Sequence, residues 1–365
     1  FTLRNVMLAG VAILLLGPDQ IAGPSFQMSF AATAAIIAGV ERGVFPRFSS
    51  PEASLPERAL RGFATVVAAN LVMSVLAEIA LLPIALHHFH RIAWYGALGN
   101  LLSFLLVDFV IMPAVLATLI ALPLGLEGFV LPILGWGCEE LNGIARWIGG
   151  QEEAVTFTPG FGMGAMVAAA AALAIATIAR TWLGLLAIPL YLAAVWQGAH
   201  EPLPLLRADA AGTSFALRMA DGRLGTVGEA RGRFAIGRWL EADGDARGAR
   251  DRTLPLESCD PLGCATRLPD GRVLALTRRV EALAEDCARA DVLVATFPVR
   301  IACARPRLVV DRDTLAAAHG LAIHDGATRP KLDTVAGRCR DRPWCPVPPA
   351  RAPGPRAGGG SPPDQ

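Results

Sequence analysis

Charged residues are scarce in the first 200 residues of the chain. That stretch holds 8 Arg and 11 Asp or Glu residues, whereas residues 201–365 hold 25 Lys or Arg and 21 Asp or Glu residues. Over all 365 residues the charged fraction is 18%, against about 25% in an ordinary soluble domain, and the mean hydropathy is +0.45. This shortage excludes a single soluble globule and predicts a membrane-embedded part followed by a water-soluble part.

The chain also lacks a strong excess of charge of either sign. The net charge is −3 up to residue 200 and +4 after it, which gives +1 overall. Lysine is nearly absent, since Lys331 is alone among 33 basic residues, and a GC-rich coding bias explains this as well as any function does. Charge by itself therefore does not indicate nucleic acid as a partner.

Sequence signatures of hydrolytic sites are missing from the soluble part. It contains no H-x-H-x-D-H, G-x-S-x-G, P-loop or H-E-x-x-H pattern. His319 and His324 are isolated, which favours structural roles over metal ligation. We therefore expect no catalytic residue, no metal site and no cofactor.

Six apolar runs are candidates for membrane-spanning helices, because such a helix needs about 20 mostly apolar residues. They are 2–16, 26–40, 63–86, 96–121, 163–179 and 183–196. Between them, 124–136 predicts a re-entrant or interfacial piece and 138–148 an amphipathic surface helix. The predicted fold class is an α-helical polytopic membrane domain of about six transmembrane helices over 1–200, followed by a small α/β soluble domain.

Arginines in the connecting loops indicate conflicting orientations. Arg91 and Arg180 place their loops in the cytoplasm and the segment after Trp196 outside. That choice leaves a second group outside, against the positive-inside rule, namely Arg42, Arg47, Arg58 and Arg61. We keep the first assignment, which predicts a C-terminal domain outside the cytoplasm.

From residue 205 onward, short β-like runs and Asp-Gly turns replace the long apolar runs. The runs are 214–219, 224–227, 273–276, 292–297 and 307–310, with one helix at 281–289. This pattern predicts a small α/β domain over 201–340. The Pro, Gly, Ala and Arg composition that follows predicts a disordered tail over 341–365.

Polar residues recur inside two of the predicted spans. Asn70, Ser74 and Glu78 are four residues apart, which puts them on one side of a helix. The next span adds Asn100 and Asp108. Because an ionisable residue inside a span marks a functional pathway by default, we predict that the two helices face one aqueous space. In the alternative interpretation, Asn70 and Ser74 hold helices together and Glu78 is protonated or reaches the interface.

Prolines interrupt the same spans. Pro83, Pro113 and Pro123 bend these helices and free backbone carbonyls, which neighbouring groups or water must then satisfy. The prolines therefore favour broken helices along a pathway, although each one could instead serve packing alone.

Three histidines and an arginine cluster at 87–91. The stretch has no i, i+4 His pair and no nearby Cys or carboxylate, so metal binding is the minor alternative. We interpret it as an interfacial cationic cluster that meets phosphate or lipid headgroups.

Six of the seven cysteines lie after residue 200: Cys259, Cys264, Cys287, Cys303, Cys339 and Cys345. Their spacings do not match paired C-x-x-C zinc sites, which favours disulfides in an oxidising compartment. Cys259 with Cys264 is the favoured local pair, and the sequence does not choose among the other connectivities. Cys138 is expected to be a small buried residue.

Three stretches of the chain resemble the competence-domain core of the ComEC DNA-internalisation family. They are Thr-Leu-Arg-Asn at 2–5, Pro-Ser-Phe-Gln-Met-Ser-Phe at 24–30, and His-Phe-His-Arg at 88–91 followed by Asn100. The family pattern Gly-Phe-Gln-Leu-Ser-Phe is matched with Ser25 for Gly and Met28 for Leu. The resemblance covers about residues 1–200, and since the chain starts at Phe1 without an initiator Met we expect it to be N-terminally truncated.

The resemblance implies an inner-membrane channel component for single-stranded DNA in natural transformation. The expected partners are single-stranded DNA, membrane lipid and other competence proteins, with a possible homo-oligomer. His90 and Arg91 are expected to contact phosphate at the pore mouth. The expected lining residues are Asn5, Gln27, Asn70, Ser74, Glu78, Asn100 and Asp108.

Many members of this family end in a metallo-β-lactamase-like domain. The strand 290–296 resembles the one that leads into a His-His-Gly metal motif, but Phe297, Pro298 and Val299 stand in that place. The resemblance therefore implies a degenerate, metal-free C-terminal domain, retained for docking or for guiding DNA. A proton-coupled small-solute transporter that uses Glu78 or Asp108, and a non-catalytic membrane scaffold, are the alternatives.

Overall fold

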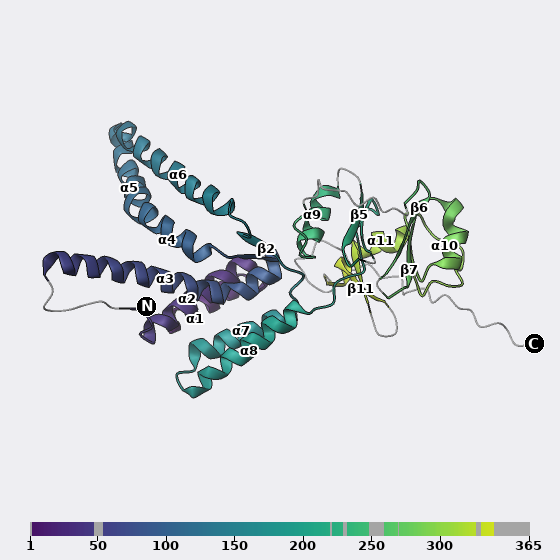
Figure 1. The fold of residues 1–365 in the computed structure, drawn as a ribbon, viewed down its shortest axis with the longest axis horizontal. Coiled ribbons are helices and arrows are strands. Elements are labelled where there is room, and N and C mark those ends of the chain that lie inside the picture. The colour runs from purple at the N-terminus through teal and green to yellow at the C-terminus, as the bar shows by residue number, and fades with distance from the viewer. Residues whose placement is uncertain are drawn as a thin grey trace, which may run out of the picture. The chain divides into compact units, whose positions relative to one another are not determined.

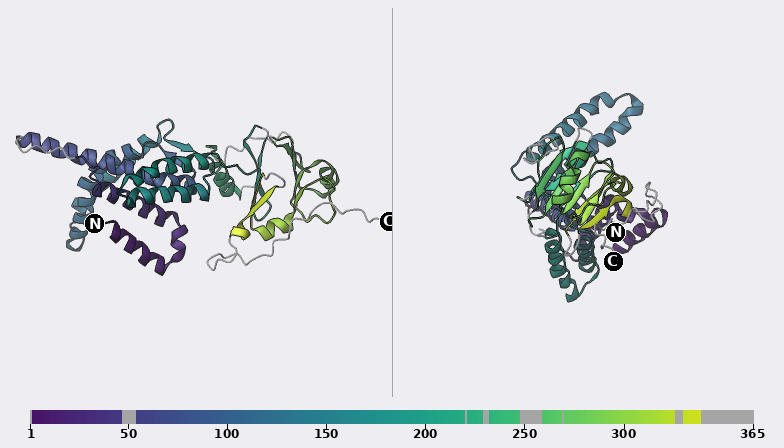
Figure 2. Two further views of the ribbon diagram at one scale, coloured as in Figure 1. Left: turned by 90° about the horizontal axis from the view of Figure 1, so that it is seen from below. Right: turned by 90° about the vertical axis from the view of Figure 1, so that its right-hand side faces the viewer.

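The chain divides after His200 into two compact units, a helical unit (Phe1–His200) and a sheet unit (Glu201–Gln365). Figures 1 and 2 show both units in a computed structural model. The structure describes residues 2–46, 54–219, 221–228, 232–247, 259–268, 270–325 and 330–338. Cys339, Cys345 and the tail predicted over 341–365 lie outside these ranges.

The helical unit is built from helical hairpins arranged around α3 (Figure 1). In chain order its elements are α1 (Leu3–Leu16), η1 (Pro18–Ala22), α2 (Pro24–Glu41), α3 (Leu55–Phe89), β1 (Arg91–Ala93), α4 (Gly96–Leu106), η2 (Val107–Ile111), α5 (Met112–Ala121), η3 (Leu122–Leu124), α6 (Glu127–Gly149), β2 (Val155–Phe157), α7 (Met163–Ile178), η4 (Trp182–Leu186) and α8 (Ala187–Ala199). Strands β1 and β2 pair antiparallel and tie the end of α3 to the start of α7.

Three of these helices are long and apolar enough to cross a membrane: Leu55–Phe89, Gly96–Leu124 and Trp182–Ala199. Their apolar surfaces are mostly exposed in the protein itself, as expected of helices that face lipid. The shorter runs predicted at 2–16, 26–40 and 163–179 form α1, α2 and α7. The predicted count of six spans is therefore supported at three positions and not confirmed at the other three.

Residues 124–148 were expected to form two separate pieces, and that prediction is wrong. The structure has one continuous helix, α6, which contains Pro132. The helix continues past Gly137 because it packs there on η2, where a Cβ on Gly137 would come within 2.9 Å of the Ile111 side chain. Close packing of this kind overrides the helix-breaking tendency of Gly and Pro.

The sheet unit contains two sheets. The first has five antiparallel strands in the order β11-β10-β3-β4-β5, and the second has four strands in the order β6-β7-β8-β9. The strands are β3 (Leu206–Ala208), β4 (Ser214–Arg218), β5 (Leu224–Gly228), β6 (Gly263–Arg267), β7 (Val273–Thr277), β8 (Val292–Ala295), β9 (Leu308–Val310), β10 (Leu321–His324) and β11 (Lys331–Thr334). Helices α9 (Arg233–Glu241), α10 (Leu283–Arg289), α11 (Arg312–Ala318) and α12 (Val335–Arg338) complete the described part.

The two sheets pack face to face, and α9 and α10 cover their outer faces. Phe215 and Leu217 of β4 share one buried cluster with Val292 and Val294 of β8. The alternate residue Ala216 packs with α9, and Leu293 packs with α10. Because successive side chains on a strand point to opposite faces, both central strands are buried on both sides. The result is a four-layer helix–sheet–sheet–helix sandwich.

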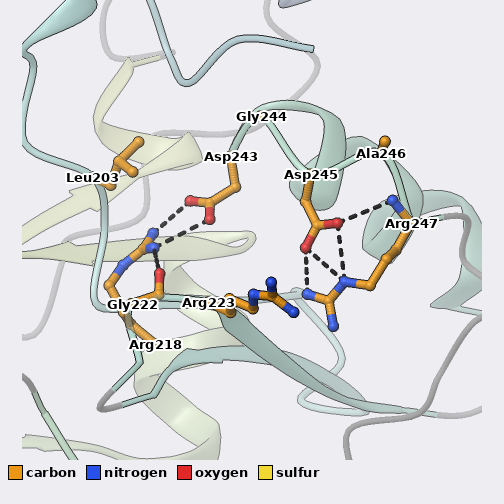
Figure 3. A pocket seen from close by; sticks show the side chains of 9 residues that line it. All are labelled: Leu203, Arg218, Gly222, Arg223, Asp243, Gly244, Asp245, Ala246 and Arg247. Carbon is orange, nitrogen blue, oxygen red and sulfur yellow. Dashed lines mark hydrogen bonds and ion pairs between the residues drawn. The ribbon is translucent and has the colours of Figure 1, made fainter. Parts of the chain in front are cut away.

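A buried ion pair joins the end of β4 to the segment after α9 (Figure 3). Arg218 pairs with Asp243 through both carboxylate oxygens, and the two side chains are 8% and 6% exposed. Arg218 also donates to the carbonyls of Pro204 (3.0 Å) and Gly222 (2.7 Å). These bonds satisfy the buried guanidinium, which would otherwise be costly inside the unit.

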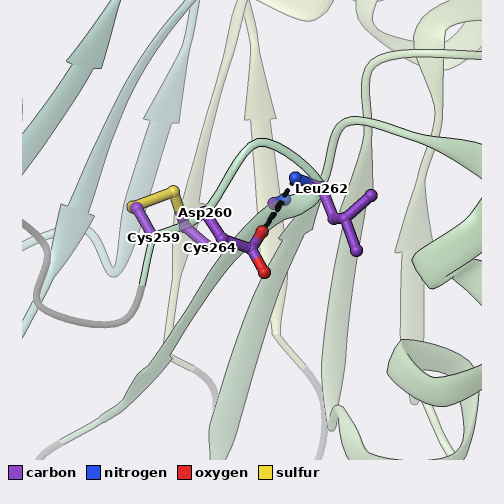
Figure 4. The surroundings of a disulfide bond; sticks show 5 residues. Cys259, Asp260, Leu262 and Cys264 are labelled. Atoms are coloured by element: carbon purple, nitrogen blue, oxygen red, sulfur yellow. Dashed lines mark hydrogen bonds between the residues drawn. A yellow bond between two sulfur atoms is a disulfide. The ribbon is translucent and has the colours of Figure 1, made fainter.

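Two disulfides lie at and beside the second sheet. The structure joins Cys259 to Cys264, the predicted local pair, and Cys287 of α10 to Cys303. In the loop between Cys259 and Cys264, the Asp260 carboxylate accepts hydrogen bonds from the backbone N–H groups of Leu262 and Gly263, each at 2.8 Å (Figure 4). Cys138, expected to be buried, is free and exposed on α6.

A proline in α3 is compensated by a side chain from α8. Pro83 has no N–H, so the carbonyl of Ile79, four residues earlier, lacks its helical donor. The hydroxyl of Tyr191 donates to this carbonyl at 2.6 Å. In apolar surroundings an unpaired carbonyl is costly, so this bond both satisfies α3 and attaches α8 to it.

We expect Tyr191→Phe to lower the stability of the helical unit by about 1 kcal/mol, the usual scale of an interhelical hydrogen bond in membrane proteins. Thermal unfolding of the chain in detergent measures the change, with Tyr95→Phe as the matched control. Combining Tyr191→Phe with Pro83→Ala returns an N–H donor to Ile79, so the cost of losing the hydroxyl should shrink. Equal cost in both backgrounds would contradict the assignment.

Candidate functional site

The predicted polar stripe on α3 faces other parts of the helical unit. Ser74 is 7% exposed, and Asn70 and Glu78 are half-buried. The atoms Asn70 Oδ1 and Glu78 Oε1 are buried and have no hydrogen-bond partner among the described residues. Two acceptor oxygens without donors on one helix face favour a hydrated environment along this stripe.

The side chain of Glu78, a residue of α3, lies against the N-terminal end of α4. A Cβ on Gly96 would come within 2.2 Å of Glu78 Oε1, so only glycine permits this approach. The carboxylate also faces the backbone N–H of Ala97. Because the N-terminus of a helix carries partial positive charge and unpaired N–H groups, it stabilises a carboxylate there. The structure thus gives Glu78 a partner in the second predicted span.

The other predicted lining residues are not brought together by a described contact. Asn5 on α1, Asn100 on α4 and Asp108 in η2 are exposed. Asp108 belongs to a π-helical turn that precedes Pro113, at the join of α4 and α5. Among the described residues, no hydrogen bond or ion pair links these three side chains to Asn70, Ser74 or Glu78. That all of these residues line one path stays a prediction.

Two histidines that the prediction did not assign to the lining hold the C-terminal end of α3. His87 Nδ1 lies 2.6 Å from the Phe161 carbonyl oxygen, and His88 Nε2 lies 2.9 Å from Gln27 Oε1. Both partners are oxygens, so each of these ring nitrogens acts as the donor. Gln27 in turn donates to the Ile21 carbonyl at 2.8 Å. Gln27 is therefore a link between α2 and α3, and the His-rich composition was the signal that could have revealed it.

His90 and Arg91 form the turn after α3. His90 has a φ of 54°, the left-handed conformation that ends the helix. Arg91 then enters β1, is exposed, and places its guanidinium 5.8 Å from the centre of the Phe89 ring. An exposed guanidinium next to a strand of the β1–β2 pair is open to an anion, and the predicted phosphate contact of Arg91 stays a prediction.

Arg91 and Arg180 lie at opposite ends of the helical unit, so the grouping used to predict orientation is wrong. Arg180, after α7, pairs with Glu41 at the end of α2. Phe161, before α7, contacts His87 and packs on Gly198 near the end of α8. The end of the unit with Arg42 and Arg180, called here the arginine-rich end, therefore contains the C-terminal ends of α2 and α7. Arg91 and His200, the last residue of the unit, lie at the other end.

A cavity of about 400 Å³ lies on the sheet unit beside the buried ion pair (Figure 3). Its lining includes Arg218, Arg223 and Arg247, with Asp243 and Asp245. Burial opposes ionisation of Asp245, but its hydrogen bonds from Arg247 outweigh burial and hold the pKa of Asp245 below the ordinary value. Two of the three arginines are thus neutralised by aspartates, and the cavity does not form a strong anion site.

The loop after β8, where the resemblance would place metal ligands, is held by an aspartate. Asp311 caps α11 by accepting from the Thr314 backbone N–H at 3.0 Å, and it lies 3.3 Å from the Val299 backbone nitrogen. Among the described residues, there is no group of three or more His, Cys, Asp or Glu side chains that could hold a metal ion.

Residues 2–183 match the family model described as Competence protein. This match covers all the predicted lining residues and the cluster at 87–91. No curated protein and no solved structure matches the chain. Through its helical unit, the chain belongs to the competence protein family of the ComEC type.

Proposed function

We propose that the helical unit forms part of a path for single-stranded DNA across the bacterial inner membrane during natural transformation. The family match carries this proposal, because it supports a role in competence and DNA uptake and spans the polar stripe of α3. The stripe belongs to α3, one of the described helices that are long and apolar enough to cross a membrane, and this supports the proposal. The proposal adds that DNA moves along these helices.

The chemistry of the stripe suits a polyanion that passes through. Asn70 and Ser74 are neutral groups that can bond to water, phosphate or base edges without repulsion. Glu78 is the one acid of the stripe, and its charge faces the positive end of α4. An acid held in this way repels phosphate less than an acid that projects into open water.

The mouth of the proposed path lies at the end with Arg91. Its exposed guanidinium can pair with phosphates, while His90 beside it forms the turn into β1. Such contacts position a strand without reading its sequence. We propose these two residues as the first phosphate contacts.

The positions of the arginines support an orientation. Arg42, Arg58, Arg61 and Arg180 belong to one end, whereas Arg91 and Arg146 belong to the other. By the positive-inside rule, the first end is cytoplasmic. The segment after α8 is then periplasmic, which agrees with two disulfides in the sheet unit, because such bonds persist in oxidising compartments.

We propose that the sheet unit is a degenerate metallo-β-lactamase-like domain without catalytic activity. Its four-layer sandwich is compatible with that origin, and Phe297, Pro298 and Val299 replace the expected metal motif. The unit would dock other competence proteins or guide DNA. A second copy of the chain is a further candidate partner.

One observation favours a different function, a proton-coupled transporter. Glu78 Oε1 is a buried carboxylate oxygen without a partner, and such a group inside a span can relay protons. This function requires that the side chain gain and lose a proton, whereas the DNA path requires only that an acceptor face α4. The two requirements lead to opposite expectations for a neutral amide at this position.

The DNA path predicts that the polarity of the α3 stripe is needed for uptake. We expect Asn70→Leu to reduce entry of labelled DNA into the cytoplasm by about tenfold or more, since it replaces a polar group of similar size by an apolar one. The assay uses a competent strain lacking its own channel, complemented by this chain fused to the N-terminal part of a family member. Thr65→Val is the control, because the Thr65 hydroxyl donates to its own helix at Arg61. Unchanged entry with Asn70→Leu at normal expression would contradict the lining role.

The role of Glu78 separates the two candidate functions. Glu78→Gln keeps an oxygen that accepts from Ala97, so DNA entry should stay within about twofold of the parent chain. Glu78→Leu removes the acceptor and should lower entry about as strongly as Asn70→Leu. Proton-coupled solute flux that is lost in Glu78→Gln, with DNA entry absent in every variant, would instead establish the transporter.

The proposed orientation predicts that the sheet unit lies outside the cytoplasm and that its disulfides are formed there. In cells carrying Cys138→Ser, Cys339→Ser and Cys345→Ser, a membrane-impermeant maleimide should label the exposed Cys259 only after an impermeant reductant has opened its disulfide. Gel-shift analysis measures the labelling, and permeabilised cells serve as the comparison. Labelling that needs permeabilisation but no reductant would place the unit in the cytoplasm.

A further inference from the structure

The arginine-rich end of the helical unit contains a cavity of about 220 Å³ between the ends of α2 and α7 and the start of η4. By volume it has room for about seven water molecules at their share of liquid volume, which is enough for a phosphate group. Its lining includes two cations and a hydroxyl residue, namely Arg42, Arg180 and Thr181. Leu185 continues the lining along the apolar helix.

Arg42 covers the negative end of α7. Its Nη2 donates to the carbonyls of Ala176 (2.5 Å), Thr177 (3.3 Å) and Ala179 (2.9 Å). These carbonyls lie at the C-terminal end of the helix, where the last four have no intrahelical donor. A guanidinium in this position offsets the partial negative charge that would otherwise repel an anion from the cavity.

By formal charge, the described residues at the cavity include one more positive than negative group. Arg180 pairs with Glu41 and is nevertheless 73% exposed, while Arg42 forms no ion pair with any described carboxylate. Two guanidinium groups thus face one carboxylate. A singly charged anion would balance the cluster and take up N–H donors of Arg180 that Glu41 does not use.

The surroundings of the cavity are those of a lipid interface. Trp182 and Leu185 are 72% and 66% exposed, and Ile178 at the end of α7 is 56% exposed. Exposed Trp and Arg side chains at the end of an apolar helix are typical of the headgroup level of a bilayer. Exposed apolar side chains next to a basic cavity suit a ligand with a charged head and acyl chains.

We propose that this cavity binds the phosphate headgroup of an anionic phospholipid, with Arg180 as the principal contact and Arg42 as the group that keeps the site electropositive. The ligand is available at this depth from the membrane itself. The site is independent of DNA passage, so failure of either proposal leaves the other standing.

The test counts lipids retained by the full chain in a neutral detergent, by native mass spectrometry. Phosphatidylglycerol is titrated against phosphatidylcholine with the same acyl chains. We expect one phosphatidylglycerol to be retained in preference. Arg180→Gln should weaken its apparent affinity roughly fivefold, which corresponds to about 1 kcal/mol for one basic residue near anionic lipid. Arg146→Gln, an equal charge change at the other end of the unit, should have no effect.

A second variant predicts the opposite direction. Glu41→Gln removes the carboxylate that competes for Arg180 and should strengthen phosphatidylglycerol binding, a gain that a purely structural role for the pair would not produce. Equal retention of the two lipids, unchanged affinity in Arg180→Gln, or weaker binding in Glu41→Gln would overturn the proposal. Displacement of the lipid by millimolar inorganic phosphate would show a small-anion site and would overturn the lipid assignment as well.

Discussion

The helical unit depends on satisfying backbone carbonyls where water is scarce. An unpaired carbonyl in hydrocarbon costs several kcal/mol, and this unit creates one at Pro83 inside α3. The last carbonyls of α7 also lack helical donors, at the end of that helix. Tyr191 supplies the donor for the first and Arg42 for the second. Both donors come from a different helix, so the solution to a local backbone problem also fixes which helices are neighbours.

The same constraint explains why polar residues gather where helices join. Gln27, His87 and His88 connect α2, α3 and the segment before α7 through short bonds to oxygen atoms. Each bond joins segments that are distant in the sequence, and apolar packing between small residues such as Ala165 and Ala169 does the rest. The sheet unit is stabilised differently, because its two sheets remove their apolar inner faces from water. Polar groups buried there, such as Arg218, must be fully paired.

Sequence patterns predicted the two-part organisation and most strands of the sheet unit, because alternation and charge density are local properties. Strands appear at the five predicted runs. Strands β3, β6, β10 and β11 were not predicted, since each of them contains at most one β-branched or aromatic residue. The predicted break in α6 was wrong: the helix runs on through Pro132 and Gly137, and at Gly137 it packs closely on Ile111, a contact that no local pattern records. The grouping of arginines failed for a similar reason: which ends of helices coincide is decided by long-range pairs such as Arg180 with Glu41.

The position of Glu78 explains how an acid can be tolerated along a path for a polyanion. The prediction placed Glu78 among lining residues and left its negative charge without a counterpart. In the structure, Gly96 allows the carboxylate to approach the start of α4, whose N–H groups and dipole offset that charge. A side chain at position 96 would push the carboxylate away from this partner and back toward the stripe. A glycine on another helix thus permits a partial offset of the Glu78 charge. The remaining groups of the stripe, Asn70 and Ser74, are the uncharged kind that the proposed DNA path requires.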